Sequence, residues 1–199
     1  MISNDQKVKN VEIVNKLIVS FDSDRCKKVL KMLDGPIGEE YFLAPASSRE
    51  DYHACYPGGL CQHSLNVVKY LKSIADALCP GRYDDKTLAF VGLFHDLGKA
   101  GDGMTRRYVP NESRWHRERG MLYERFPPKE MEWTTHADGS IYVLQKNGII
   151  LSHEEWVAIK THDGLYRDEN KPYRHNNPNL ALLLHWADMW SCMSEKDEV

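Results

Sequence analysis

Residues 88–99 read LAFVGLFHDLGK, an apolar run that ends in charged and polar side chains. Apolar residues recur at helical spacing up to His95, so the stretch predicts a helix that ends shortly after it. Asp96 then lies at the end of an apolar helix, where burial of its carboxylate is costly unless a cation offsets the charge. Lys99 follows three residues later, near enough to share that side of the helix end. The stretch therefore predicts a helical core with charged groups and a cation at one point.

The composition describes a soluble globular protein. The chain has 199 residues, of which 42% are hydrophobic, and its 26 Lys and Arg against 29 Asp and Glu give a net charge of −3. We expect a single domain over residues 1–199. A charge so close to zero argues against a protein that binds long nucleic acid through bulk positive charge. It also argues against a polybasic membrane-surface protein.

The cysteines and the apolar runs indicate the cellular compartment in which the protein is expected. The five cysteines are an odd number without a C-x-x-C pair, which indicates reduced thiols rather than a disulfide framework. The longest apolar runs fall far short of the roughly 20 residues that a membrane span needs, and the amino terminus is polar. We expect a cytoplasmic protein without a signal peptide or a transmembrane helix.

Apolar spacing and capping residues predict six or seven helices. Two short helices are expected within the first 33 residues, and the others at about 60–78, 84–97, 113–126, 152–163 and 178–191. Residues 140–151 differ, because alternating apolar residues flank a turn at 146–148, as in two short strands. The expected fold is therefore mainly α, with a small β-hairpin inserted at about 127–151.

Histidines and carboxylates recur on the inner side of several predicted helices. Facing helices of a bundle can project such ligands to one point. Imidazole and carboxylate together suit Mn, Fe, Co, Ni or Zn rather than Ca or Mg, and the lack of cysteine argues against a structural zinc site. The alternative is that each histidine is an ordinary hydrogen-bonded core residue. The candidates are His63, His95, Asp96, His116, His162 and Asp188.

Three motifs together resemble the HD superfamily of metal-dependent phosphohydrolases. They are Gly58-Gly59-Leu60-x-x-His63, His95-Asp96-Leu97-Gly98-Lys99 and Ala187-Asp188, and the resemblance covers about residues 52–192. It implies an HD-domain helical bundle. It also implies that His63, His95, Asp96 and Asp188 are metal ligands.

Two further histidines resemble the additional ligands of superfamily members that hold two metals. His116 is similar to the start of their H-x-x-x-G helix, and His162 is similar to their helix that ends in His-His, although Asp163 stands at the second of those positions. The resemblance implies one or two divalent ions per chain. With two ions, Asp96 would bridge them.

Hydrolysis of a phosphate ester by metal-activated water is the reaction that fits such a site. Asp96 is the first candidate catalytic residue. Lys99 is the second, because it could offset charge on the phosphoryl oxygens, although it could also be a solvated lysine at a helix end.

Substrate-binding candidates come from the loops. A polar loop carries Arg167, Lys171, Arg174 and His175, which either bind phosphate beside Lys99 or stay solvated. The same alternatives hold for Arg106 and Arg107. His53 is expected to contact substrate, whereas His136, His153 and His185 are expected to be structural or surface residues.

The leading functional hypothesis is a nucleotidase or nucleoside-triphosphate hydrolase that acts on a small nucleotide. The alternative is a phosphodiesterase or 3′-5′ exonuclease on short RNA or cyclic nucleotides. It is favoured by residues 53–63, which resemble the branch with bacterial exoribonucleases and relaxase-associated HD domains, whereas the Gly-Tyr-Pro extension of the cyclic-di-GMP branch is missing. A third reading is a non-catalytic HD domain that senses a nucleotide. The expected partner is thus a small phosphorylated molecule, and neither a membrane nor long nucleic acid is expected.

Overall fold

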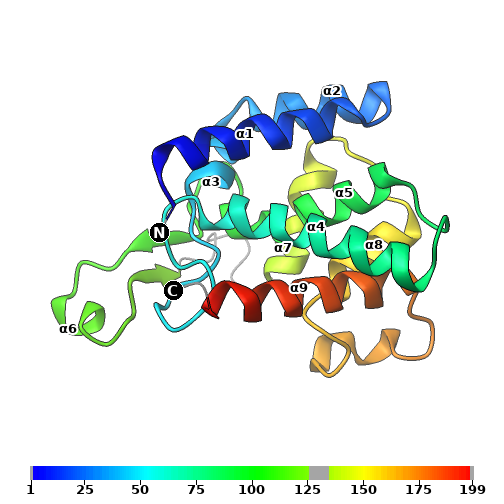
Figure 1. Ribbon diagram of the computed structural model, residues 1–199. Helices are drawn as coiled ribbons and strands as arrows, with labels where there is room; N and C mark the ends of the chain where they lie inside the picture. The colour runs from blue at the N-terminus through cyan, green and yellow to red at the C-terminus, as the bar shows by residue number, and fades with distance from the viewer. Residues whose placement is uncertain (1, 126–134, 198–199) are drawn as a thin grey trace.

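The computed structural model describes residues 2–125 and 135–197, and it is mainly helical (Figure 1). The prediction of a mainly α fold is confirmed. In chain order the elements are α1 (Asn4–Val19), α2 (Ser23–Leu33), α3 (Pro36–Leu43), α4 (Gly59–Leu78), α5 (Asp85–Phe94), the 3-10 helix η1 (Leu97–Ala100), β1 (Tyr108–Pro110), α6 (Arg114–Arg117), β2 (Tyr123–Arg125), α7 (His136–Lys146), α8 (His153–Thr161), the 3-10 helix η3 (Asp168–Tyr173) and α9 (Asn179–Asp197).

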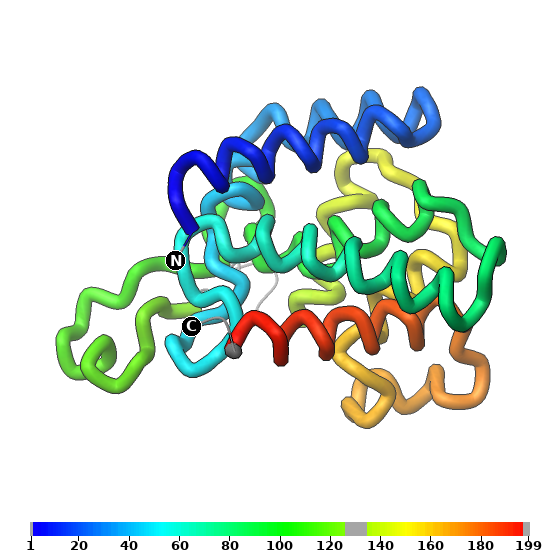
Figure 2. The backbone as a smooth tube through the Cα atoms, in the orientation of Figure 1, coloured from blue at the N-terminus to red at the C-terminus, as the bar shows by residue number. Residues whose placement is uncertain are grey.

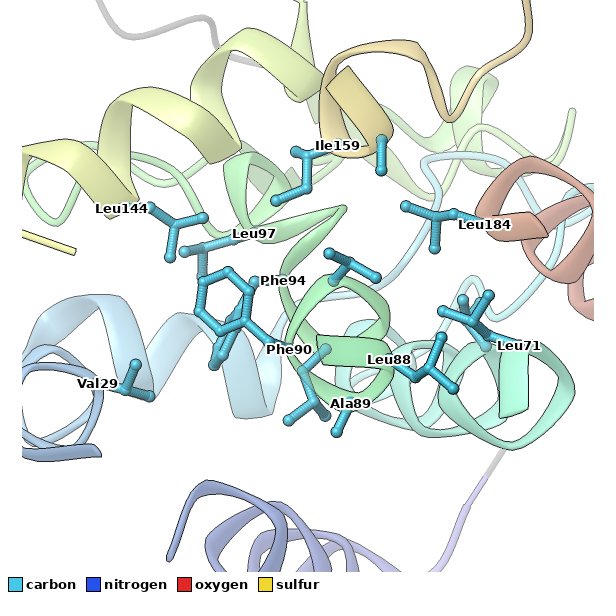
Figure 3. Packing of buried hydrophobic residues seen from close by; sticks show 14 of the residues in the cluster. Val29, Leu71, Leu88, Ala89, Phe90, Phe94, Leu97, Leu144, Ile159 and Leu184 are labelled. Atoms are coloured by element: carbon cyan, nitrogen blue, oxygen red, sulfur yellow. The ribbon is translucent and has the colours of Figure 1, made fainter. Parts of the chain in front are cut away.

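Helix α5 is the centre of the core. Every residue from Leu88 to Phe94 is buried, as expected for a helix that is apolar on all sides. Helices α1, α4 and α8 pack against it, and α9 packs against α4 and α8. Figure 3 shows Phe90 and Phe94 of α5 among labelled side chains from α2, α4, α7, α8 and α9. Because α5 is enclosed, the residues that directly follow it lie deep in the protein.

The predicted capping residues form the expected hydrogen bonds. The Asp84 side chain accepts from the backbone N–H of Thr87 at the start of α5. Ser152 and Glu155 form a complete capping box at the start of α8. Glu155 also pairs with Arg25 of α2, with 2.6 Å between Nη1 and Oε1, so the same carboxylate ties α2 to α8.

The two glycines before α4 direct that helix into the core. Gly58 has a φ of +87°, which favours glycine, and a Cβ on Gly59 would lie 2.0 Å from the carbonyl oxygen of Ala54. The chain can therefore turn tightly against the preceding loop before α4 begins. As a result, His63 lies in the second turn of α4 on its buried face.

The position predicted for the hairpin is wrong. Residues 136–146 form α7, capped by the Thr135 side chain, and the residues of 127–134 lie outside the described part of the chain. The apolar residues there fit helical spacing as well as strand alternation, since Ile141 and Leu144 are both buried on α7. The packing of α7 against η1 and α8 favours the helix over the two strands.

The hairpin of the structure lies earlier in the chain. Strands β1 and β2 are antiparallel and pair Tyr108 with Arg125 and Pro110 with Tyr123. Helix α6 lies between them and ends at Arg117, so the helix predicted to reach residue 126 is too long. The segment from β1 to β2 projects from the helical layers (Figure 2).

One further helix, α3, follows α2. Pro36 is the first residue of α3, a helix that the sequence reading did not include. All five cysteines are free thiols. Among the described residues, no helix combines the length and the apolar character that crossing a bilayer requires.

Candidate metal centre

Five of the predicted ligands meet in the core. His63 comes from α4, His95 and Asp96 follow α5, His162 follows α8, and Asp188 belongs to α9. The Nε2 atom of His63 lies 3.0 Å from Asp188 Oδ1, and the Nε2 atoms of His95 and His162 each lie 3.4 Å from a carboxylate oxygen of Asp96. All five are buried except Asp188, which is partly exposed. Residues more than 120 positions apart thus converge on one point.

His136 also lies at this point, although the sequence predicted it to be a structural or surface residue. Its Nε2 atom lies 3.1 Å from His162 Nε2 and 3.3 Å from both Asp96 Oδ1 and Asp163 Oδ2. A local signal for this placement exists, because Thr135 and Asp138 have the spacing of a helix cap, which puts His136 at the first position of a helix.

Close contact between η1 and α7 brings His136 to this point. A Cβ on Gly98 would lie 2.2 Å from the carbonyl oxygen of His136, so only glycine permits this approach. The Ser140 hydroxyl donates to the carbonyl oxygens of His95 and His136 and accepts from the N–H of Gly98. The glycine of the HDLGK stretch therefore positions a histidine about 40 residues away in sequence.

We use the name HD cluster for the seven residues that these contacts connect. Among the described residues, they form three overlapping sets that could hold a metal ion, with ligand atoms within 4.8 Å of one another in each set. The HD cluster consists of His63, His95, Asp96, His136, His162, Asp163 and Asp188.

His116 is not brought to the HD cluster. It lies on α6, at the end of the projecting segment in Figure 1, and its ring packs edge-on against Trp115. None of the metal-competent sets found among the described residues includes it. The residue that completes the set beside His162 is His136 instead.

The imidazoles are oriented for metal binding. The Nδ1 atoms of His95 and His162 lie 2.9 Å from the Gly92 carbonyl and 2.7 Å from the Ile159 carbonyl, so each Nδ1–H donates there and Nε2 is the atom that faces the site and could bind a metal. His95 Nε2 and Asp96 Oδ1 are buried and have no hydrogen-bond partner in the described part of the protein. Buried polar atoms rarely lack a partner, and a divalent cation would satisfy both.

A cavity of about 280 Å³ borders the HD cluster, and His136 and Asp163 line it. Three of the predicted substrate-binding residues, His53, Lys99 and Arg167, line it as well. Arg107 and Arg125 line it too, and Arg125 was not among the residues predicted from the sequence.

The other predicted substrate-binding residues do not line this cavity. Lys171 is exposed and pairs with Asp168. Arg174 is exposed, and its Nε donates to the carbonyl oxygen of Leu165 at 2.9 Å. His175 is exposed on the same loop. Only the start of that loop reaches the site.

Comparison with known families agrees with this geometry. The sequence profile of the HD domain matches residues 60–191, which is most of the chain. The chain belongs to the HD superfamily of metal-dependent phosphohydrolases. No curated protein and no solved structure matches it.

A carboxylate outside the HD cluster orients one of its histidines. Both oxygens of Glu195 lie 3.2 Å from Nδ1 of His63. Asn66 and Ser191 donate to Glu195 Oε1 at 2.8 and 2.7 Å. Carboxylates in this position fix the tautomer and the ring orientation of a metal-binding histidine. Glu195 was not among the residues predicted from the sequence. It follows Asp188 by two helical turns, so the two carboxylates share one face of α9.

Glu195→Gln is expected to weaken metal binding by about 10- to 100-fold, because the amide keeps the shape but removes the charge that supports His63. Metal affinity measured by competition with a chelator tests this expectation. Glu12 is exposed on α1, and Glu12→Gln is the matched control. Equal affinity in Glu195→Gln and the control would contradict the role assigned to Glu195.

Asp96 of the HD cluster forms a buried ion pair with Lys99, with 2.6 Å between Oδ2 and Nζ. Burial acts to raise the pKa of Asp96, but the charges of Lys99 and His95 outweigh it and hold that pKa well below its usual range. Burial acts to lower the pKa of His95, but Asp96 and Asp188 raise it to about 10. The carboxylates therefore draw a proton or a cation to the imidazoles, and metal binding releases the proton.

His53 lies between the cavity and the HD cluster. Its ring centroid is 4.6 Å from that of His63, and its Nε2 atom is buried without a hydrogen-bond partner in the described part of the chain. Burial, and then the neighbouring His63 and Lys99, lower the pKa of His53 to about 3, so the ring is neutral. His53 thus offers an uncharged polar group to a molecule in the cavity.

Proposed function

We propose that this HD protein hydrolyses a phosphate ester of a small nucleotide, as a nucleotidase or nucleoside-triphosphate hydrolase. The observation that carries the proposal is the pair of buried atoms without partners, His95 Nε2 and Asp96 Oδ1, beside a cavity lined with cations. The first feature calls for a metal ion and the second for an anionic substrate.

The HD cluster has enough donors for one or two divalent ions. His63, His95 and Asp188 form one set, and His136, His162 and Asp163 form another. Asp96 lies between these sets, since its oxygens face His95, His136 and His162. Imidazole and carboxylate donors favour Mn, Fe, Co, Ni or Zn.

A bound divalent ion supplies a water whose pKa is lowered to about 7 and polarises a phosphoryl oxygen. Lys99 is held by Asp96 and also lines the cavity, so its charge faces the phosphoryl group that is attacked. His53 borders the same space as a neutral hydrogen-bonding group.

The test uses the purified full chain with Mn²⁺ or Co²⁺. We expect one or two ions per chain by elemental analysis, and turnover of p-nitrophenyl phosphate and nucleotides that a chelator abolishes and metal restores. Turnover of bis(p-nitrophenyl) phosphate instead would favour the phosphodiesterase or 3′-5′ exonuclease alternative. Bound metal with nucleotide binding but no turnover would favour the non-catalytic sensor. Absence of both metal and turnover would refute the enzymatic proposal.

A further inference from the structure

Two arginines of the hairpin lie side by side at the cavity. Arg107 directly precedes Tyr108, and Tyr108 is the register partner of Arg125 on the opposite strand. Both side chains line the cavity that His136 and Lys99 line. The cavity therefore brings together two arginines that lie on either side of α6 in the chain, and the charge of Arg125 acts on Arg107.

Neither guanidinium has a carboxylate within ion-pair distance among the residues that the structure describes. Arg107 is half-buried, and burial together with the charge of Arg125 lowers its pKa. Arg125 donates from Nε only to the neutral hydroxyl of Ser48. Two cations that repel each other, one of them partly desolvated, are stabilised by an anion between them.

Two other arginines near Arg107 and Arg125 each have an acidic partner. Arg106 is paired with Glu40, with 2.6 Å between Nε and Oε1, and lies outside the cavity. Arg167 lines the cavity but is balanced by Asp163 at 3.7 Å. Only Arg107 and Arg125 combine a place in the cavity with no nearby acidic partner in the described ranges.

We propose that Arg107 and Arg125 form a second anion subsite, which binds a phosphate group of the substrate other than the one that is hydrolysed. The inference rests on the proposed phosphohydrolase function and narrows it to substrates with a polyphosphate chain, such as nucleoside di- and triphosphates. Guanidinium groups bind phosphate oxygens in a bidentate manner, which suits such a chain. The cavity has a volume of about 280 Å³ and borders the HD cluster, so both phosphates can belong to one small molecule.

The first test measures binding without turnover. Isothermal titration of the full chain with inorganic tripolyphosphate and with inorganic phosphate compares the wild type with Arg107→Gln, Arg125→Gln and the control Arg106→Gln. We expect each cavity variant to bind tripolyphosphate about tenfold more weakly, inorganic phosphate within about twofold, and the control to match the wild type. Unchanged tripolyphosphate affinity in both cavity variants, or an equal loss in the control, would overturn the subsite.

The second test uses turnover by the metal-loaded protein. For a nucleoside triphosphate, we expect Arg107→Gln and Arg125→Gln to raise KM about tenfold with little change in kcat, and to leave the kinetics of p-nitrophenyl phosphate nearly unaffected. An equal loss on both substrates would overturn the subsite.

The two tests separate the subsite from the proposed function. If tripolyphosphate binding depends on Arg107 and Arg125 but no substrate is turned over, the proposed function fails and the subsite stands. If substrates are turned over with unchanged KM for the triphosphate, the subsite fails and the proposed function stands. Arg107→Lys and Arg125→Lys keep the charge without the planar fork, and they provide folded variants of intermediate effect if a glutamine variant does not fold.

Discussion

Asp96→Asn is expected to reduce metal content to near zero and turnover by about a thousandfold or more, since it removes the central negative charge that a divalent ion would need. Asp96 is buried, and its oxygens face three histidines of the HD cluster. Elemental analysis and kinetics with p-nitrophenyl phosphate measure the two effects. Asp76 is exposed on α4, and Asp76→Asn serves as the control.

The same substitution is expected to lower the free energy of unfolding by about 3 kcal/mol, because it leaves the buried ammonium of Lys99 without a carboxylate. The double variant with Lys99→Met removes that ammonium as well, so it should regain most of the stability without regaining metal. Asp96→Asn with normal metal content and turnover would contradict the central role of this carboxylate.

The second large effect distinguishes two histidines. His136→Ala is expected to lower metal affinity and turnover by at least about a hundredfold, because even residues that only orient metal ligands contribute 10- to 100-fold. His116→Ala is expected to retain most of both, because His116 lies on α6 outside the HD cluster. Metal titration and steady-state kinetics on the two variants give the comparison.

The outcome decides between two assignments of the additional ligand. Loss of activity in His116→Ala with normal activity in His136→Ala would restore the assignment made from the resemblance and contradict the structural one. Thermal melting controls for folding, and we expect little change for His136→Ala, since the Thr135 cap and the buried face of α7 remain intact.

Local sequence patterns predicted some parts of the fold well, for identifiable reasons. The helices around His63, His95 and Asp188 are bounded by glycine, proline or capping side chains, and these act through near neighbours in the chain. The capping box at Ser152 is of the same kind. Where a helix boundary depends on such local hydrogen bonds, the sequence is sufficient to predict it.

Local patterns left α7 ambiguous, although Thr135 and Asp138 have the spacing of a helix cap. Its apolar residues fit strand alternation over a short window, and its position depends on contact with η1. That contact requires Gly98, whose missing side chain admits the backbone of His136. The partner in this contact lies outside residues 136–146, so the prediction of strands there was wrong and His136 was not included among the predicted ligands.

The sequence by itself determined the mainly α fold, the superfamily and five residues of the HD cluster, because those five residues lie in or beside motifs and helix boundaries that are set by neighbours in the chain. Only the tertiary structure decided that His136 rather than His116 joins them, that Glu195 supports His63, and which of the neighbouring Arg106 and Arg107 lines the cavity. These three outcomes depend on which distant backbones touch and which carboxylates lie within reach of a side chain. Both are properties of packing between segments rather than of any one segment.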